Sequence, residues 1–125
     1  LLQLAALRGR FMELLAEKLY PDQRDLRDPA FITGLMSVVP AALGMSMTDV
    51  LSHVAVGNDV RLALARREGT LGQLFMLIER YDDNDVPATQ TLLSTYGARA
   101  SLSLLGEILG ESLSWVQQLD SEAES

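Results

Sequence analysis

Apolar residues recur at steps of three and four along nearly the whole chain, and this spacing restricts the fold more than any other feature. The clearest case is the run of Leu71, Leu74, Phe75, Ile78 and Tyr81. Such spacing predicts helices that each bury one apolar face. No segment alternates with a period of two, and no repeat with a period of about 20 to 50 residues occurs. We therefore expect an all-α protein, a compact bundle of about six to seven helices.

Prolines and glycines set the expected helix boundaries. Pro40 should end one helix at Val39, because the residue before a proline is disfavoured in the α conformation. Gly69 and Gly97 should end two later helices, and Thr70 should cap the one between them. The expected helices cover residues 1–20, 29–39, 46–54, 57–69, 70–81, 86–96 and 99–119.

The longest uncharged stretch, residues 29–48, has the length of a membrane span. Polar side chains interrupt it, and Pro40 and Gly44 divide it into two short pieces. Its flanks are acidic and lack the aromatic or basic anchors of a span. We therefore expect a central soluble helix packed on nearly all sides. Its expected core residues are Phe31, Leu35, Met36, Val38 and Val39.

Composition bounds the class of protein. The 125 residues suit one domain, residues 1–125, and a hydrophobic fraction of 48% is ordinary for a globular chain. The formal net charge of -7 argues against nucleic-acid binding, which needs clustered Lys and Arg. The chain has no cysteine, which removes disulfides and thiolate ligands and fits a cytoplasmic location.

Few side chains form a recognisable chemical site. The one histidine, His53, follows Ser52, and helix neighbours point about 100° apart, so we expect no nucleophile–base pair there. Residues 82–85 lack the spacing of a calcium loop. Glu107 and Glu111 share a helix face without a third metal ligand, and we expect that face to be solvated.

The glycines between and beside these glutamates, Gly106 and Gly110, should allow a neighbouring helix to approach closely. Arg8 and Arg10 border the apolar stripe of the first helix, where we expect them to pair with carboxylates or to cover the edge of the core.

Three segments carry a resemblance to a known family. They are LAALRGRFMELLAEKL at residues 4–19, AFITGLMS at 30–37 and REGTLG at 67–72, of which the last is the most specific. Together with Arg61, Tyr81 and Trp115 they resemble HDOD domains, the HD-related output domains of bacterial signalling proteins. The chain is most similar to the later part of the HDOD half of EAL-HDOD proteins. The resemblance implies that earlier helices and an EAL domain precede this segment in a longer parent chain.

The resemblance also implies an HD-domain-like helical fold whose metal centre is lost. In catalytic HD phosphohydrolases, the helix corresponding to residues 30–37 ends in a histidine and an aspartate that bind metal. Ser37 and Val38 stand in those places here. We therefore expect no catalytic residues, no metal ligands, no cofactor and no enzymatic activity.

Two functional hypotheses remain open at this point. The first is a non-catalytic regulatory or protein-interaction module, linked to cyclic-di-GMP signalling through the parent EAL domain, with a protein partner or adjacent domain. Truncation could expose apolar surface on the first helix and favour a homodimer. The alternative is a sensor that binds a nucleotide or small molecule. For either role, the candidate contact residues are Arg8, Arg10, Arg61 and Arg67.

Overall fold

The structure is a computed structural model that describes residues 2–124 of the chain. This part contains eight α-helices and one short 3-10 helix, and no strand, which confirms the all-α prediction. The additional helix is α3, which sequence analysis did not anticipate. The elements are α1 (Leu2–Leu19), η1 (Arg24–Leu26), α2 (Arg27–Met36), α3 (Val39–Leu43), α4 (Met47–His53), α5 (Asn58–Arg66), α6 (Gly69–Asp82), α7 (Val86–Ser94) and α8 (Leu102–Glu124).

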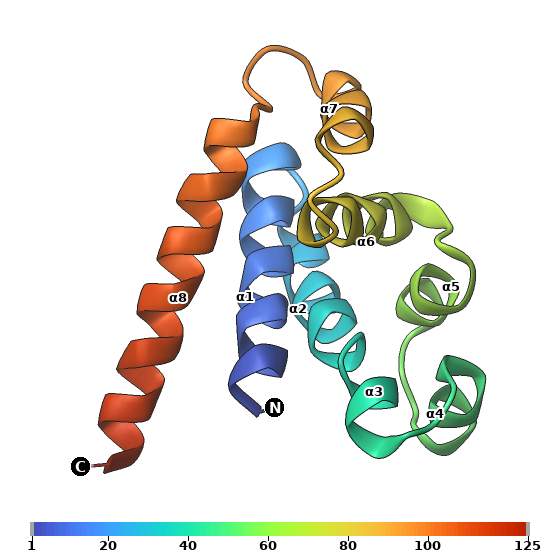
Figure 1. The fold of residues 1–125 in the computed structure, drawn as a ribbon. Coiled ribbons are helices and arrows are strands. Elements are labelled where there is room, and N and C mark those ends of the chain that lie inside the picture. Colours follow the sequence, from blue (N-terminus) through green and yellow to red (C-terminus); the bar gives the residue numbers. More distant parts are fainter. Residues whose placement is uncertain (1, 125) are drawn as a thin grey trace.

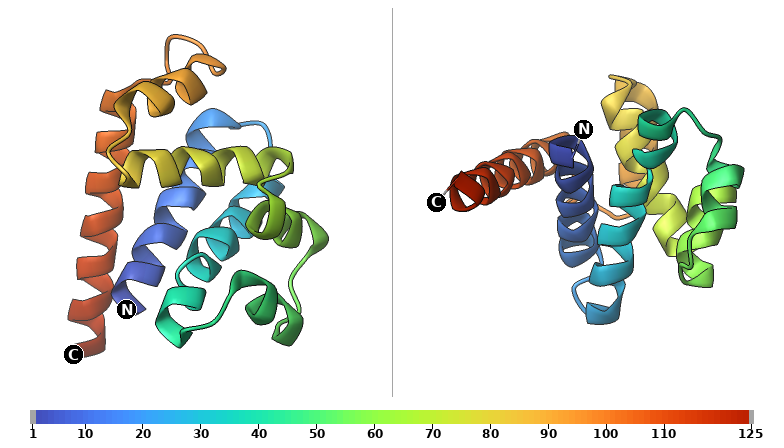
Figure 2. Two further views of the ribbon diagram at one scale, coloured as in Figure 1. Left: turned by 45° about the vertical axis from the view of Figure 1, so that its right-hand side comes forward. Right: turned by 90° about the horizontal axis from the view of Figure 1, so that it is seen from below.

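Helix α1 lies in the middle of the bundle. It packs against α2 on one side and α8 on the other, while α6 crosses near it (Figures 1 and 2). The short helices α3, α4 and α5 form the opposite edge of the molecule from α8 (Figure 1). The largest fully buried apolar side chains come from α1, α5, α6 and α8 and are Met12, Leu15, Leu64, Leu74, Leu77, Leu105 and Ile108.

Helices α1 and α2 approach each other so closely that their backbones are in contact. A Cβ atom at Gly34 would come within 2.3 Å of the Arg8 carbonyl oxygen, so only glycine fits at this crossing. Across the same contact, the ring of Phe31 packs on Gly9, where an added Cβ would lie 3.0 Å away. The position of α2 is therefore set by small residues.

This crossing corrects the expectation for the uncharged stretch. The buried residues of α2 are Ala30, Thr33 and Gly34, and of the five expected core residues only Val38 is buried. Phe31, Leu35, Met36 and Val39 are half-buried. The helix packs its small residues against the backbone of α1, so its larger side chains are only half-buried, and Ile32 is 38% exposed.

Pro40 begins a helix and does not end one. Helix α2 stops at Met36, and α3 starts at Val39 with the proline in its first turn. A proline loses no hydrogen bond there, because the first helical N–H groups have no intrahelical partner. Within residues 2–124 no single helix could cross a membrane. One pair bent by 111°, Arg24–Leu43 with Met47–His53, meets the length and composition of a broken span.

The boundary between α5 and α6 also differs from expectation. Helix α5 ends at a left-handed residue, Arg67 with φ 55°, two positions before the expected terminator Gly69. Helix α6 then starts at Gly69, preceded by Glu68, and Thr70 lies inside it with no capping bond. Asn84, after α6, is also left-handed, with φ 58°.

Helix α8 is longer than predicted and continues through much of the acidic tail to Glu124. Its apolar spacing favours Leu105, Leu113 and Val116 as core residues, and Leu105 and Val116 are buried, but Leu113 is 46% exposed. At the other side of the α1–α8 pair, Leu4 is 45% exposed. The apolar stripes of both helices are therefore only partly covered by the described chain.

Candidate functional site

Ser37 and Val38, which the resemblance sets at the place of an HD metal motif, offer a hydroxyl and an apolar side chain. Ser37 donates its hydroxyl hydrogen to the Gly34 carbonyl oxygen at 2.6 Å, and its Oγ accepts from Arg8 Nη1 at 3.5 Å. Val38, directly after it, is 6% exposed. Among the described residues, no group of three or more His, Cys, Asp or Glu side chains comes together in a metal-binding arrangement.

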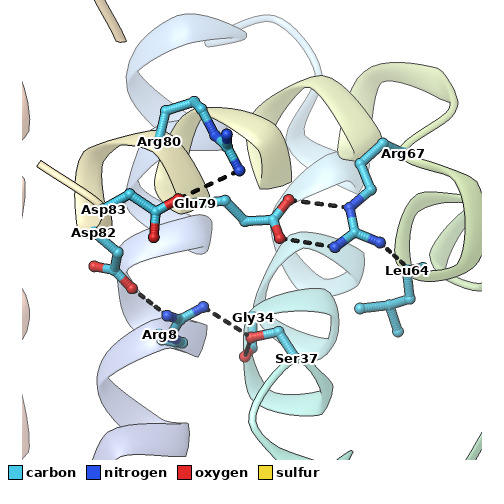
Figure 3. A network of polar contacts seen from close by, with 9 residues as sticks. All are labelled: Arg8, Gly34, Ser37, Leu64, Arg67, Glu79, Arg80, Asp82 and Asp83. Carbon is cyan, nitrogen blue, oxygen red and sulfur yellow. Dashed lines mark hydrogen bonds and ion pairs between the residues drawn. The ribbon is translucent and has the colours of Figure 1, made fainter. Parts of the chain in front are cut away.

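Arg8 joins three helices at this point. Its Nη2 forms an ion pair with Asp82 at the end of α6, while Nη1 reaches Ser37 at the end of α2 (Figure 3). Beside the pair, a hollow of about 280 Å³ lies between α1, α6 and α8. Apolar side chains form most of its lining, and Arg8, Asp82, Tyr81 and Asn84 supply its polar groups.

Arg67 is held by a two-point ion pair. Its Nε donates to Glu79 Oε1 at 3.0 Å and its Nη2 donates to Oε2 at 2.7 Å (Figure 3). Its Nη1 donates to the Leu64 carbonyl oxygen at 2.9 Å, and its guanidinium lies 4.6 Å from the Phe75 ring centroid. The hydrogen bond to Glu79 raises the pKa of Arg67 above its ordinary value.

The most specific part of the resemblance, REGTLG, builds the corner at which Arg67 lies. A Cβ at Gly72 would come within 2.3 Å of the Arg67 carbonyl carbon, so α6 packs on this backbone only because position 72 is glycine. Gly69 has φ 77°, a conformation that glycine adopts readily. Leu71 is buried in the core. These residues therefore fix the geometry of a turn.

Arg10 and Arg61 are also engaged within the chain. Arg10 Nη1 pairs with Glu13 Oε1 at 2.9 Å, and its guanidinium lies 5.4 Å from the centroid of Trp115, which contacts Phe31 edge to face. Arg61 donates to the carbonyl oxygens of Leu51 at 3.0 Å and Val54 at 3.4 Å, near the end of α4. The expected carboxylate pairing of Arg8 and Arg10 is confirmed.

The four candidate arginines do not meet at one place. Arg8 lines the hollow of about 280 Å³, Arg67 lines another of about 560 Å³ between α6 and α7, and Arg10 lines a third of about 700 Å³ on α8. Arg61, on α5, reaches the end of α4 instead. A ligand in any one of these hollows would therefore contact one of the four.

Ser52 and His53 come closer than the helix argument allowed. Ser52 Oγ lies 3.0 Å from His53 Nδ1, because both side chains fold back to the Asp49 carbonyl oxygen, at 2.6 Å and 2.8 Å. A carbonyl only accepts, so we infer that Nδ1 carries a hydrogen directed at it. In this tautomer Nδ1 has no lone pair to take the serine proton. The prediction that helix geometry keeps the two side chains apart is wrong.

The acidic residues of segment 82–85 form ion pairs at the end of α6 and cap the start of α7. Asp82 pairs with Arg8, and Asp83 pairs with Arg80 at 3.3 Å. Asp85 caps α7 by accepting from the Ala88 N–H at 3.2 Å. Sequence reasoning did not identify Asp82 and Glu79 as partners of Arg8 and Arg67, because they lie 74 and 12 residues away along the chain.

By its fold the chain is an all-α helical bundle, and one comparison with known proteins extends this. The chain is similar to a cyclic di-GMP phosphodiesterase, CdgJ, of Vibrio cholerae serotype O1, with 34% identity over 85 residues. The match covers 68% of this chain and 19% of that protein, so the chain spans about a fifth of its length. No family model matches the chain, and no solved structure matches it.

Proposed function

We propose that this chain is a non-catalytic regulatory or protein-interaction module of a bacterial signal transduction protein. It forms the later part of an HDOD-type domain and acts in cyclic-di-GMP signalling, through an EAL domain in the parent chain. It works in the cytoplasm by packing against that domain or another protein, and it performs no chemistry of its own.

This proposal rests mainly on the two side chains at the position where an HD metal motif would lie. Ser37 gives its hydrogen to a backbone carbonyl and receives Arg8, while Val38 is packed into the protein. Neither side chain offers a metal the imidazole or carboxylate that such a centre uses. The surrounding polar groups serve to hold α1, α2 and α6 together.

A second support is the use of the sequence motifs. The REGTLG residues form the turn between α5 and α6, and Arg67 and Glu79 form an ion pair with each other. The relative named above is a cyclic di-GMP phosphodiesterase, and this chain covers a fifth of it. This supports a link to cyclic-di-GMP signalling, and we propose that the phosphodiesterase reaction belongs to other parts of such a protein.

The test combines an assay of the module alone with an assay in trans. With Mg²⁺, Mn²⁺ or Zn²⁺ added, we expect no hydrolysis of cyclic di-GMP or of bis-p-nitrophenyl phosphate. Added to the separately purified EAL domain of its parent, the module should change that domain's rate or its binding of cyclic di-GMP. Metal-dependent turnover by the module alone would overturn the proposal.

The hollow beside Arg8 favours a second candidate function, a sensor of a nucleotide or small molecule. Its volume of about 280 Å³ suits a small ligand, and it combines apolar walls with a guanidinium, a carboxylate and an amide. A ligand that binds the native state must raise the melting temperature by mass action. A thermal-shift panel of nucleotides, repeated with Arg8→Met, would support this candidate if one compound stabilises only the unaltered protein.

A further inference from the structure

The outer side of α8 carries two glycines that no contact within the described chain explains. Gly106 and Gly110 are exposed, and a Cβ added at either would meet no atom within 4 Å. The buried side of α8 lies elsewhere: Ser112, about 120–160° around the helix from the two glycines, is fully buried. Glycine weakens a helix, so two of them on an open face point to a use outside this chain.

An apolar edge borders these glycines. Leu113 is three residues beyond Gly110 and seven beyond Gly106, so it lies on the same side of α8, and it is 46% exposed. Leu109, next to it on the helix surface, is half-buried. In all views α8 lies at the edge of the molecule beside α1, with its outer side uncovered (Figures 1 and 2).

The other edge is acidic. Glu107 and Glu111 are exposed, and no ion pair reaches either among residues 2–124. They border the hollow of about 700 Å³, which Gly110 and Trp115 also line. Arg10 also lines this hollow, but it forms its ion pair with Glu13. Helix α8 contains no lysine or arginine.

We propose that the outer face of α8 binds an amphipathic, basic helix of a partner protein. Small residues of that helix would pack on Gly106 and Gly110, its apolar side on Leu109 and Leu113, and its Lys or Arg side chains on Glu107 and Glu111. A second copy of α8 fits less well, because it has no cation to offer these carboxylates. The proposal deepens the proposed function and rests on it, since it names the surface and partner chemistry of an interaction module.

The test uses fluorescent peptides of about 20 residues, long enough to form a helix. One has an alanine and leucine face flanked by lysine, and its counterpart has glutamate in place of every lysine. We expect saturable binding of the basic peptide in fluorescence anisotropy, weakened by salt, and none of the acidic peptide.

Two variants test the glycine face and the acidic edge separately. Gly110→Leu fills the open face and should weaken binding by at least about tenfold, while the melting temperature stays the same or rises. The double variant Glu107→Gln with Glu111→Gln should weaken binding and flatten its salt dependence. Matched controls on the far side of the molecule are Ala65→Leu for added apolar surface and Asp59→Asn with Glu68→Gln for lost charge, and both should bind normally.

The proposal would be overturned if the basic peptide did not bind, or if the acidic peptide bound as well as the basic one. It would also be overturned if Gly110→Leu bound the basic peptide as tightly as the unaltered protein. A homodimer that Gly110→Leu disrupts would also overturn it, by showing that a second copy covers the face. The proposed function fails separately. If the module still alters the EAL domain in trans while no peptide binds, only the docking face is wrong.

Discussion

Gly72 packs so closely on the backbone of Arg67 that a single methyl group added to the glycine would come within 2.3 Å of the Arg67 carbonyl carbon. Arg67 is itself left-handed and is held by Glu79 of the same helix as Gly72. The corner between α5 and α6 therefore depends on one missing side chain and one ion pair together.

This contact predicts opposite effects of one substitution in two helices. Gly72→Ala should lower the free energy of unfolding by about 1–3 kcal/mol, because the added methyl forces the corner apart. Gly110→Ala in α8 should raise it by about 0.5–1 kcal/mol, because nothing lies near that position and alanine favours helix. Urea unfolding followed by circular dichroism measures both. A loss of stability in the α8 variant would contradict the open face described above.

The ion pair of Arg8 with Asp82 should couple α1 to α6 weakly. The two side chains are 23% and 44% exposed, so we expect a coupling free energy of about 0.5–1 kcal/mol in a double-mutant cycle of Arg8→Met and Asp82→Asn. The coupling should fall at high salt, which screens partly exposed charges. A cycle that closes to zero at low salt would show that the pair does not stabilise the native state.

The Tyr20–Tyr96 pair predicts a loss of stability at alkaline pH. Burial and the hydrogen bond between the two hydroxyls, 3.1 Å apart, raise the pKa of Tyr96 above its ordinary value of 10.0. The unfolded chain then releases this proton before the folded one does. The resulting stabilisation is present below about pH 10 and is lost as the pH rises from there towards the raised pKa.

Tyr96→Phe measures this effect directly. At neutral pH the variant should be less stable by about 1 kcal/mol, since it lacks the hydrogen bond. Above pH 10 the difference from the unaltered protein should narrow, because only the unaltered protein has this group to ionise in its unfolded state. Thermal unfolding at a series of pH values shows it, and a constant difference would contradict the raised pKa.

If the proposed function is right, introducing an HD metal motif at positions 37 and 38 should lower stability and produce no activity. Val38→Asp places a carboxylate at a site that is 6% exposed, which we expect to lower the free energy of unfolding by at least about 2 kcal/mol. The loss should be smaller at low pH, where the carboxyl group is protonated. Val38→Thr, of nearly the same shape, is the control for polarity without charge.

The double variant Ser37→His with Val38→Asp completes the two missing positions. We expect no stoichiometric metal by mass spectrometry and no phosphodiesterase turnover, since no cluster of further ligands lies near within the described residues. Metal binding with turnover would show that the rest of such a site survives.

Local patterns predicted the helices well and their contacts less well. The period of Leu71, Leu74, Phe75 and Ile78 gave both a helix and its buried face correctly, because propensity and burial agree there. Pro40 and Gly69 were misplaced because each residue type can either begin or end a helix, and the neighbouring chain decides which. Leu113 follows the three- and four-residue spacing of the apolar stripe of α8, but it lies at the edge of that stripe and is 46% exposed.

The candidate site was predictable in its residues and not in its geometry. Ser37, Val38 and the arginines could be selected from the motifs. The partners Asp82 and Glu79 could not, because ion pairs between distant residues leave no periodic signal. The separation of Arg8, Arg10, Arg61 and Arg67 into different places likewise follows from packing alone.

The glycine corner has a further consequence for the comparison of related chains. Gly69 and Gly72 meet demands of the backbone, and Arg67 holds the corner through its ion pair with Glu79, so a chain can exchange side chains that bind or react elsewhere and still need these three. A search guided by REGTLG will therefore gather proteins that turn between two helices in the same way, whatever each of them does. We expect the functions of such proteins to differ through residues outside this turn, on surfaces such as the outer side of α8.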